Sequence, residues 1–126
     1  AIRMLDDAVA YAKERRQFDK AIGEFQLVQA MLAECKVEIE AARALILQTA
    51  RKRDRGEDVT MDVSLCKYYS TEMCGRVADK AVQIFGGAGY VKGTGIERFY
   101  RDVRAFRVYE GTSQIHLLNI AKNLLK

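Results

Sequence analysis

The sequence predicts an all-α domain: an antiparallel four-helix bundle with one short extra helix before the last helix. Apolar residues recur three or four positions apart over long stretches, which is the pattern of amphipathic helices. No hairpin dipeptide joins two alternating apolar–polar runs, so strands are not expected. Long helical stretches joined by short loops are typical of antiparallel bundles. The chain has 126 residues, enough for one domain with a buried core.

The first two predicted helices flank a loop near the N-terminus. Residues 1–14 carry apolar side chains on one helical face. Residues 15–24, which precede the next helix, mix charged residues with one glycine and one aromatic residue, so an ordered loop is expected there. The second helix is expected over residues 25–55, with Gly56 at its C-terminal cap. Its buried seam is predicted to comprise Phe25, Val28, Leu32, Cys35, Ile39, Ala42, Ile46 and Thr49.

The second half of the chain is expected to hold one long helix and two shorter ones. The long helix is predicted over residues 60–85, with Asp58 or Thr60 capping its start. A glycine-rich segment ends it, and there the backbone must turn tightly or approach another group closely. A short helix near residues 96–104 and a last helix near residues 113–125 complete the bundle. The seam of the long helix is predicted to comprise Val63, Cys66, Ser70, Met73, Val77, Ala81 and Ile84.

The composition is that of an ordinary globular domain, with 49% apolar residues, 30% charged residues and a net charge of +4. The densest basic run, residues 51–55, falls at the expected end of the second helix, where cations interact favourably with the helix dipole. No aromatic residues interleave with this run, so nucleic-acid binding is not expected. No apolar run approaches the roughly 20 residues of a membrane-spanning helix. No signal peptide is visible, and the chain opens in a helical pattern as if cut from a longer protein.

The cysteines and the single histidine argue against disulfides and metal binding. Cys35, Cys66 and Cys74 form no C-x-x-C pair, and the last two lie too far apart on one predicted helix to bridge. Free, buried thiols in a reducing compartment are therefore expected. His116 is expected to be a helix-surface residue and not a catalyst, and no metal site is predicted.

One carboxylate, Glu110, follows an aromatic residue and precedes a glycine near the start of the last predicted helix. Gly111 lets the backbone bend, and Thr112 or Ser113 can cap that helix. Apolar neighbours disfavour the ionised form of a carboxylate, which suits a general base. The positive end of the helix dipole at the start of the last helix has the opposite effect, because it favours the ionised carboxylate. The same helix start could hold an anionic or polar ligand group. A solvated loop glutamate is the alternative interpretation of this pattern alone.

Four short motifs occur in order along the chain. They are Glu14-Arg15-Arg16-Gln17-Phe18, Phe25-Gln26, Gln83-Ile84-Phe85-Gly86-Gly87-Ala88-Gly89 and Tyr109-Glu110-Gly111-Thr112-Ser113-Gln114-Ile115. Together they closely resemble the C-terminal helical domain of the acyl-CoA dehydrogenases, and the likeness covers residues 1–126. Each motif is weak alone, but their order and spacing are specific. Asp19 and Ala21 depart from the pattern, since many relatives carry glycine and proline there, and a looser loop is expected.

The resemblance implies an FAD-dependent enzyme with an N-terminal helical domain, a middle β-barrel and a second helical domain, of which only the last is present here. It implies that Glu110 takes the α-proton of an acyl-CoA thioester while the β-hydrogen leaves as hydride to FAD. Such a base needs a dry pocket, and the forming enolate needs donors at the thioester oxygen. One of these donors would be the backbone N–H of Glu110. Without its partner domains the chain is expected to be inactive.

Nine further residues are implied to bind FAD. Arg15 would contact the pyrophosphate of a neighbouring subunit's FAD, a role that suits a guanidinium. The adenine side of the same site would be lined by Gln17, Phe18 and Gln26. Residues along the FAD would be Gln83, Gly86 and Gly87. From the start of the last helix, Thr112 and Gln114 would reach the subunit's own FAD.

The resemblance also implies partners and a location. The partners are an acyl-CoA substrate, the remaining domains of the same enzyme, further copies in a dimer or tetramer, and an electron-transferring flavoprotein. The bacterial cytoplasm or the mitochondrial matrix is expected, with no nucleic-acid or membrane partner. Two other interpretations stay open: a non-catalytic helical module that oligomerises or binds a partner, and a nucleic-acid-binding bundle that uses residues 51–55. The enzymatic interpretation predicts that the loops carrying Arg15, Gly86 and Glu110 lie near one another.

Overall fold

The computed structural model describes all 126 residues and confirms the all-α class. Its helices are α1 (Ile2–Glu14), α2 (Gln26–Asp54), α3 (Thr60–Phe85), α4 (Gly87–Tyr90), α5 (Ile96–Arg104) and α6 (Ser113–Leu124). The 3₁₀ turns η1 (Ile22–Glu24) and η2 (Ala105–Arg107) precede α2 and follow α5. A two-stranded antiparallel sheet joins β1 (Arg16–Gln17) to β2 (Lys20–Ala21).

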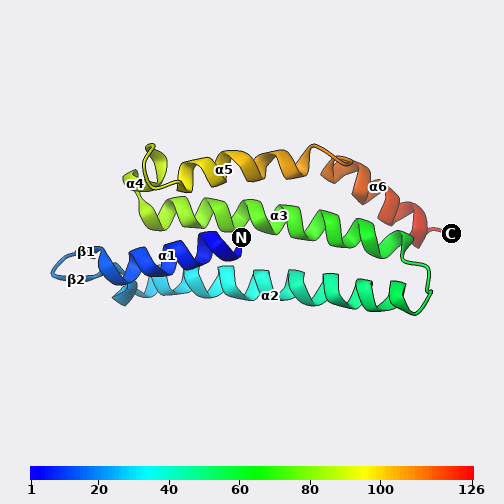
Figure 1. The fold of residues 1–126 in the computed structure, drawn as a ribbon, viewed down its shortest axis with the longest axis horizontal. Coiled ribbons are helices and arrows are strands. Elements are labelled where there is room, and N and C mark those ends of the chain that lie inside the picture. The colour runs from blue at the N-terminus through cyan, green and yellow to red at the C-terminus, as the bar shows by residue number, and fades with distance from the viewer.

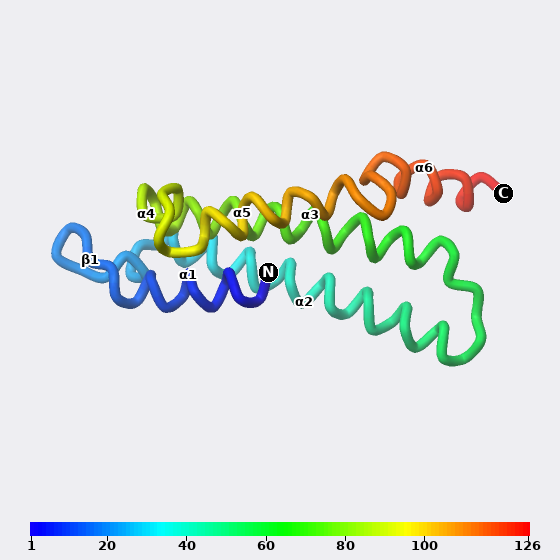
Figure 2. The backbone as a smooth tube through the Cα atoms, turned by 45° about the horizontal axis from the view of Figure 1, so that its top comes forward, coloured from blue at the N-terminus to red at the C-terminus, as the bar shows by residue number.

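Helix α3 is the centre of the bundle. It packs against α2 on one side and against α5 and α6 on the other, and α1 lies beside one half of the α2–α3 pair (Figure 1). The β1–β2 hairpin and α4 lie at one end of the molecule, and the α2–α3 connection lies at the other (Figure 2). Along the side of α3 that carries α5 and α6, the chain runs back from the glycine-rich end toward the opposite end.

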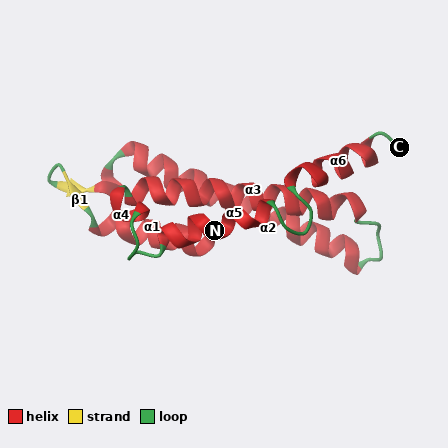
Figure 3. Cartoon of the chain, turned by 90° about the horizontal axis from the view of Figure 1, so that it is seen from above, coloured by secondary structure: helices red, strands yellow, loops and turns green.

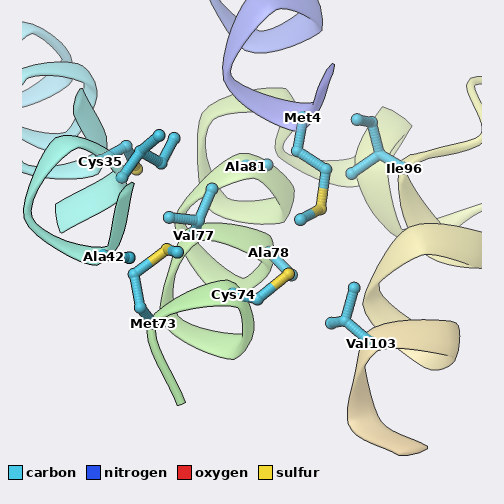
Figure 4. Packing of buried hydrophobic residues seen from close by; sticks show 11 residues of the cluster. Met4, Cys35, Ala42, Met73, Cys74, Val77, Ala78, Ala81, Ile96 and Val103 are labelled. Atoms are coloured by element: carbon cyan, nitrogen blue, oxygen red, sulfur yellow. The ribbon is translucent and has the colours of Figure 1, made fainter. Parts of the chain in front are cut away.

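The main core lies where α1, α2, α3 and α5 meet (Figure 4). Its most buried side chains include Met4, Val77 and Ile96. The predicted seams are only partly buried, because Ile46 and Val63 are 44% and 47% exposed. Both line a groove between α2 and α3 whose walls are formed by these two helices and their connection alone, so no third helix covers that groove in this chain.

Several predicted helix ends are confirmed by their hydrogen bonds. Gly56 follows α2 at a φ of 78°, a left-handed conformation that suits glycine at a helix C-terminus. The Asp58 carboxylate accepts hydrogen bonds from the Thr60 backbone N–H and hydroxyl, at 2.9 and 2.6 Å. The Thr112 hydroxyl oxygen accepts from the Ile115 N–H and caps α6.

The expectation that no strands occur is wrong for residues 16–21, which form the β1–β2 hairpin. Phe18 and Asp19 connect its strands with φ values of 51° and 63°. Positive φ at both central residues matches the twist of a tight hairpin, but it is uncommon for residues with a Cβ. The hairpin was hidden because neither residue is glycine or asparagine. The short helix α4, inside the glycine-rich segment, was also not predicted.

Helix α6 leaves the bundle toward the C-terminus (Figure 3). Leu118, Leu124 and Leu125 are 65%, 69% and 87% exposed on and beside it. None of the helices combines the length and the low charge that crossing a bilayer requires. All three cysteines are free thiols, as predicted; Cys35 and Cys74 are buried as expected, whereas Cys66 is only half-buried.

Candidate functional site

A cleft of about 400 Å³ forms where the hairpin meets the glycine-rich segment. We call it the hairpin–glycine cleft and define it by its lining residues: Tyr11, Arg15, Gln17, Ile22, Ile84, Phe85, Gly86, Gly87 and Ala88. It includes four of the predicted site residues, Arg15, Gln17, Gly86 and Gly87. Two segments that are about 70 residues apart in sequence are thereby brought together.

One part of the cleft lining carries a cationic side chain and backbone without side chains, and another part is aromatic. Arg15 is exposed and forms no ion pair, so its guanidinium is free to bind an anion. Gly86 has a φ of 60° and a ψ of −140°, a region open only to glycine, and a Cβ at Gly87 would meet nothing within 4 Å. Tyr11 and Phe85 stack with ring centroids 4.1 Å apart.

Three predicted cofactor residues lie near the cleft but outside its lining. Phe18 sits in the turn of the hairpin, is 87% exposed, and contacts Phe25 edge to face at 6.1 Å. Gln26 is exposed at the first position of α2. Gln83 is exposed in the last turn of α3, where its carbonyl accepts the Gly86 N–H at 3.2 Å.

Glu110 lies elsewhere, in a turn between η2 and α6. We call residues 109–112 the Glu110 turn. Glu110 has a φ of 54° and Gly111 a φ of 86°, so two consecutive residues are left-handed. This conformation is strained for a residue with a side chain. The Glu110 side chain is exposed, so in this chain the expected apolar surroundings are not present. Thr112 and Gln114 follow at the start of α6.

Two side chains bind the carbonyl groups of the Glu110 turn. His116 Nε2 lies 3.1 Å from the Glu110 carbonyl oxygen, and Lys67 Nζ donates to the Gly111 carbonyl oxygen at 2.6 Å. A carbonyl oxygen only accepts, so His116 carries its proton on Nε2. His116 lies on α6, as expected, but its ring is half-buried and points back at the turn.

A carboxylate on α3 ties both sides of the turn to the bundle. Glu72 accepts a hydrogen bond from the Ser113 hydroxyl at 2.6 Å and one from Arg107 Nη1 at 3.2 Å. Ser113 is 5% exposed, so this bond satisfies a buried hydroxyl. A Cβ at Gly75 would lie 3.0 Å from the Arg107 guanidinium, so a glycine leaves room for that side chain.

The prediction that all three loops lie near one another is wrong for the Glu110 turn. The turn is held by residues near position 70 of α3, whereas Gly86 follows the end of that helix. At 1.5 Å per residue the two places lie roughly 20 Å apart along α3. Helix α5 causes the separation, because it runs back along α3 before the turn begins (Figure 1).

Sequence reasoning missed the residues that shape these two places. Tyr11 and Phe85 line the cleft, and Lys67, Glu72, Arg107 and His116 hold the turn. Helical periodicity marks Tyr11 and Phe85 only as partly apolar positions. The contacts that Lys67 and Glu72 make with Gly111 and Ser113 join residues 44 and 41 positions apart, and no local pattern encodes such pairs.

The fold and these contacts define a helical domain that presents one braced carboxylate and, separately, one cationic cleft. A family model described as the acyl-CoA dehydrogenase C-terminal domain matches residues 1–125. The chain belongs to the acyl-CoA dehydrogenase family.

Relatives and solved structures agree with this assignment. The CarC subunit of the caffeyl-CoA reductase–Etf complex of Acetobacterium woodii is 45% identical over 122 residues, covering 97% of this chain and 32% of that protein. Butyryl-CoA dehydrogenase from Megasphaera elsdenii superposes with a TM-score of 0.94 at 39% identity, covering 98% of this chain and 32% of that one. The FAD complex of PigA superposes with a TM-score of 0.93 at 32% identity, with coverage of 98% and 32%. The chain thus spans about a third of the length of these relatives.

Proposed function

We propose that this chain is the C-terminal domain of an FAD-dependent acyl-CoA dehydrogenase in which Glu110 removes the α-proton of an acyl-CoA thioester. The observation that carries the proposal is the Glu110 turn, where a carboxylate sits on a left-handed backbone that contacts from α3 and α6 hold in place. Strained, externally braced residues of this kind concentrate at functional sites. The family assignment gives the carboxylate its reaction.

The proposed step transfers two hydrogens from adjacent carbons. The Glu110 carboxylate takes the α-hydrogen as a proton, and the electrons of that C–H bond form the α,β double bond as the β-hydrogen departs with its own electron pair. FAD, when bound, would accept that hydride. The Glu110 backbone N–H would donate to the thioester oxygen and stabilise the negative charge that develops there. The exposed carboxylate would gain dry surroundings from the other domains and the substrate.

The hairpin–glycine cleft supports FAD binding by this chain. Its free Arg15 guanidinium and the side-chain-free wall at Gly87 suit a pyrophosphate. Gln17, Phe18, Gln26, Gln83 and Gly86 would complete that half-site, and Thr112 and Gln114 would contact FAD beside Glu110. The distance between the cleft and the turn favours a homo-oligomer in which one subunit contributes its cleft to the active site of another.

The relatives favour two directions for the same chemistry. Butyryl-CoA dehydrogenase is named for removing hydrogen, and CarC for reducing caffeyl-CoA within an Etf complex. In the reductive direction, protonated Glu110 would return the proton to the α-carbon. An electron-transferring flavoprotein is the proposed electron partner in both cases. We place the enzyme among those that exchange two hydrogens across the α,β bond of a CoA thioester.

The test of the base uses the full-length enzyme. Glu110→Gln should bind FAD and acyl-CoA normally but lose substrate-dependent bleaching of the flavin's visible absorption under anaerobic conditions. Glu57→Gln is the matched control, because Glu57 is an exposed glutamate in the α2–α3 connection. Normal bleaching in Glu110→Gln would show that another group is the base, and would leave the non-catalytic helical module as the better account.

Sharing of sites between subunits has its own test. Full-length Arg15→Ala and Glu110→Gln are each expected to be inactive as homo-oligomers. Mixed oligomers should regain activity at about one quarter of all sites, because one site in each mixed pair combines an intact cleft with an intact turn. No recovery on mixing would show that cleft and turn serve a site within one subunit.

A further inference from the structure

We propose that His116 is a positioning residue that fixes the direction of the Glu110 carboxylate by holding the Glu110 carbonyl group. This inference rests on the proposed function, since it concerns the geometry of the proposed base. It assigns to the single histidine of the chain a role that its sequence context does not suggest.

The peptide group between Glu110 and Gly111 is the part of the turn that His116 controls. The orientation of this group sets ψ of Glu110 and φ of Gly111 together, and Gly111 is left-handed at 86°. The His116 Nε2–H binds the carbonyl oxygen of this same group at 3.1 Å. Lys67 binds the next carbonyl, that of Gly111, at 2.6 Å. Rotation about the N–Cα bond of Glu110 turns its carbonyl group and its Cα–Cβ bond together. Without a partner for the carbonyl, the residue is therefore free to leave its positive φ of 54° for a more common conformation, and the carboxylate would turn away with it.

The imidazole reaches the turn only because of the local sequence. Thr112 caps α6, so His116 begins the helix's own hydrogen bonding by donating its backbone N–H to the Thr112 carbonyl at 3.1 Å. A Cβ at Gly111 would lie 3.0 Å from His116 Nε2, so glycine is the residue that admits the ring. Gly111 therefore has two functions: it accepts a positive φ, and it leaves space for the histidine.

The second ring nitrogen of His116, Nδ1, indicates that the contact with Glu110 determines where the ring lies. His116 Nδ1 is buried and has no hydrogen-bond partner. An unpaired buried polar atom is unfavourable, so the ring is not placed to satisfy both of its nitrogens. Its one hydrogen bond is the bond to the proposed base. A histidine that only filled space would not need its Nε2 directed at this carbonyl.

The test compares two substitutions in the full-length holoenzyme. His116→Leu replaces the imidazole by an apolar side chain of similar reach and so removes the hydrogen-bond donor. His116→Gln replaces it by a side chain that again carries an N–H donor. In His116→Leu the rate of anaerobic flavin reduction by saturating acyl-CoA should fall between about 10- and 100-fold, the range expected for a misplacement of about 1 Å. FAD content and KM for acyl-CoA should stay within about twofold, and His116→Gln should recover most of the rate.

A second readout isolates the proton step. Exchange of the substrate's α-hydrogen in deuterated buffer should slow in His116→Leu and return in His116→Gln. If His116→Leu does not fold, His116→Ala removes the same donor without touching the backbone of the Glu110 turn, and kcat should again fall with KM retained.

Failure of this proposal differs from failure of the proposed function. Wild-type flavin reduction in His116→Leu, together with none in Glu110→Gln, would overturn the positioning role and leave Glu110 as the base. Equal losses of rate, FAD and melting temperature in the leucine and glutamine variants would also overturn it, since that result indicates a purely structural ring. Normal reduction in Glu110→Gln would remove the proposed function and this inference together.

Discussion

Gly89 is the glycine at which a methyl group would be least tolerated. It is buried in α4, and an added Cβ would lie 2.7 Å from the Phe85 Cβ and 2.9 Å from the Val82 carbonyl oxygen. Both atoms belong to the last turns of α3 and sit on or next to its backbone, so neither moves away as the end of a flexible side chain would. Gly87, two residues earlier in the same short helix, would meet nothing within 4 Å.

This difference predicts opposite outcomes for two similar substitutions. Gly89→Ala forces α4 away from α3, and overpacking of this kind reduces the free energy of unfolding by about 1–3 kcal/mol. For a domain of this size the melting temperature should fall by roughly 3–12 °C. Gly87→Ala introduces no clash and removes a flexible residue, so its stability should lie within about 0.5 kcal/mol of the parent chain or slightly above it.

Thermal and urea unfolding of the two variants, followed by circular dichroism, measure these quantities. In the full-length enzyme the order should reverse for cofactor binding: Gly87→Ala adds a methyl group to the wall of the proposed FAD half-site and should weaken FAD retention despite its normal stability. Equal stability of Gly89→Ala and Gly87→Ala would refute the reasoning, because the packing of α4 on α3 would then not limit the residue at position 89.

Three further predictions concern the surroundings of single residues. Glu72→Ala should lower the free energy of unfolding by about 2–3 kcal/mol, because it leaves the buried Ser113 hydroxyl without its charged acceptor; an unchanged urea midpoint would contradict this. Burial raises the pKa of the Cys35 thiol, so iodoacetamide at pH 8 should modify it at the rate of unfolding, and alkylation as fast as in urea would be the contrary result. Hydrogen bonds from the Thr60 hydroxyl and then its N–H hold the pKa of Asp58 below its usual 3.8. The stabilisation is therefore complete above about pH 5 and is lost as pH falls through 3.8 toward the lowered value, so the stability gap between the parent chain and Asp58→Ala should shrink between about pH 5 and 3.

The helices other than α4 were predictable because each has local signals that agree with one another. In α3, the apolar spacing, the Asp58 carboxylate that accepts the N–H of the first helical residue, and a terminal glycine all indicate nearly the same boundaries. The β1–β2 hairpin was not predictable, because its turn places Phe18 and Asp19 in a conformation that their types disfavour. The partial burial of the seams was not predictable either, since it depends on how far α1 reaches along its neighbours.

The candidate site divides in the same way. The motifs indicated which residues to consider, and the structure gathers Arg15, Gln17 and the glycines 86 and 87 in one cleft. The position of Glu110 relative to that cleft depends on the direction of α5 along α3. The bond between Glu72 and Ser113 depends on the register between α3 and α6. Neither direction nor register is encoded in a short stretch of sequence.

Backbone strain identifies the two candidate places without using any motif. The only residues other than glycine with positive φ are Phe18, Asp19 and Glu110. The first two form the turn of the hairpin that borders the cleft, and the third is the proposed base. Such conformations persist only where surrounding contacts outweigh their cost. At Glu110 these contacts come from α3 and α6, through Lys67 and His116. A chain that served only as a helical scaffold would have no need to hold a glutamate, instead of a glycine, in this conformation.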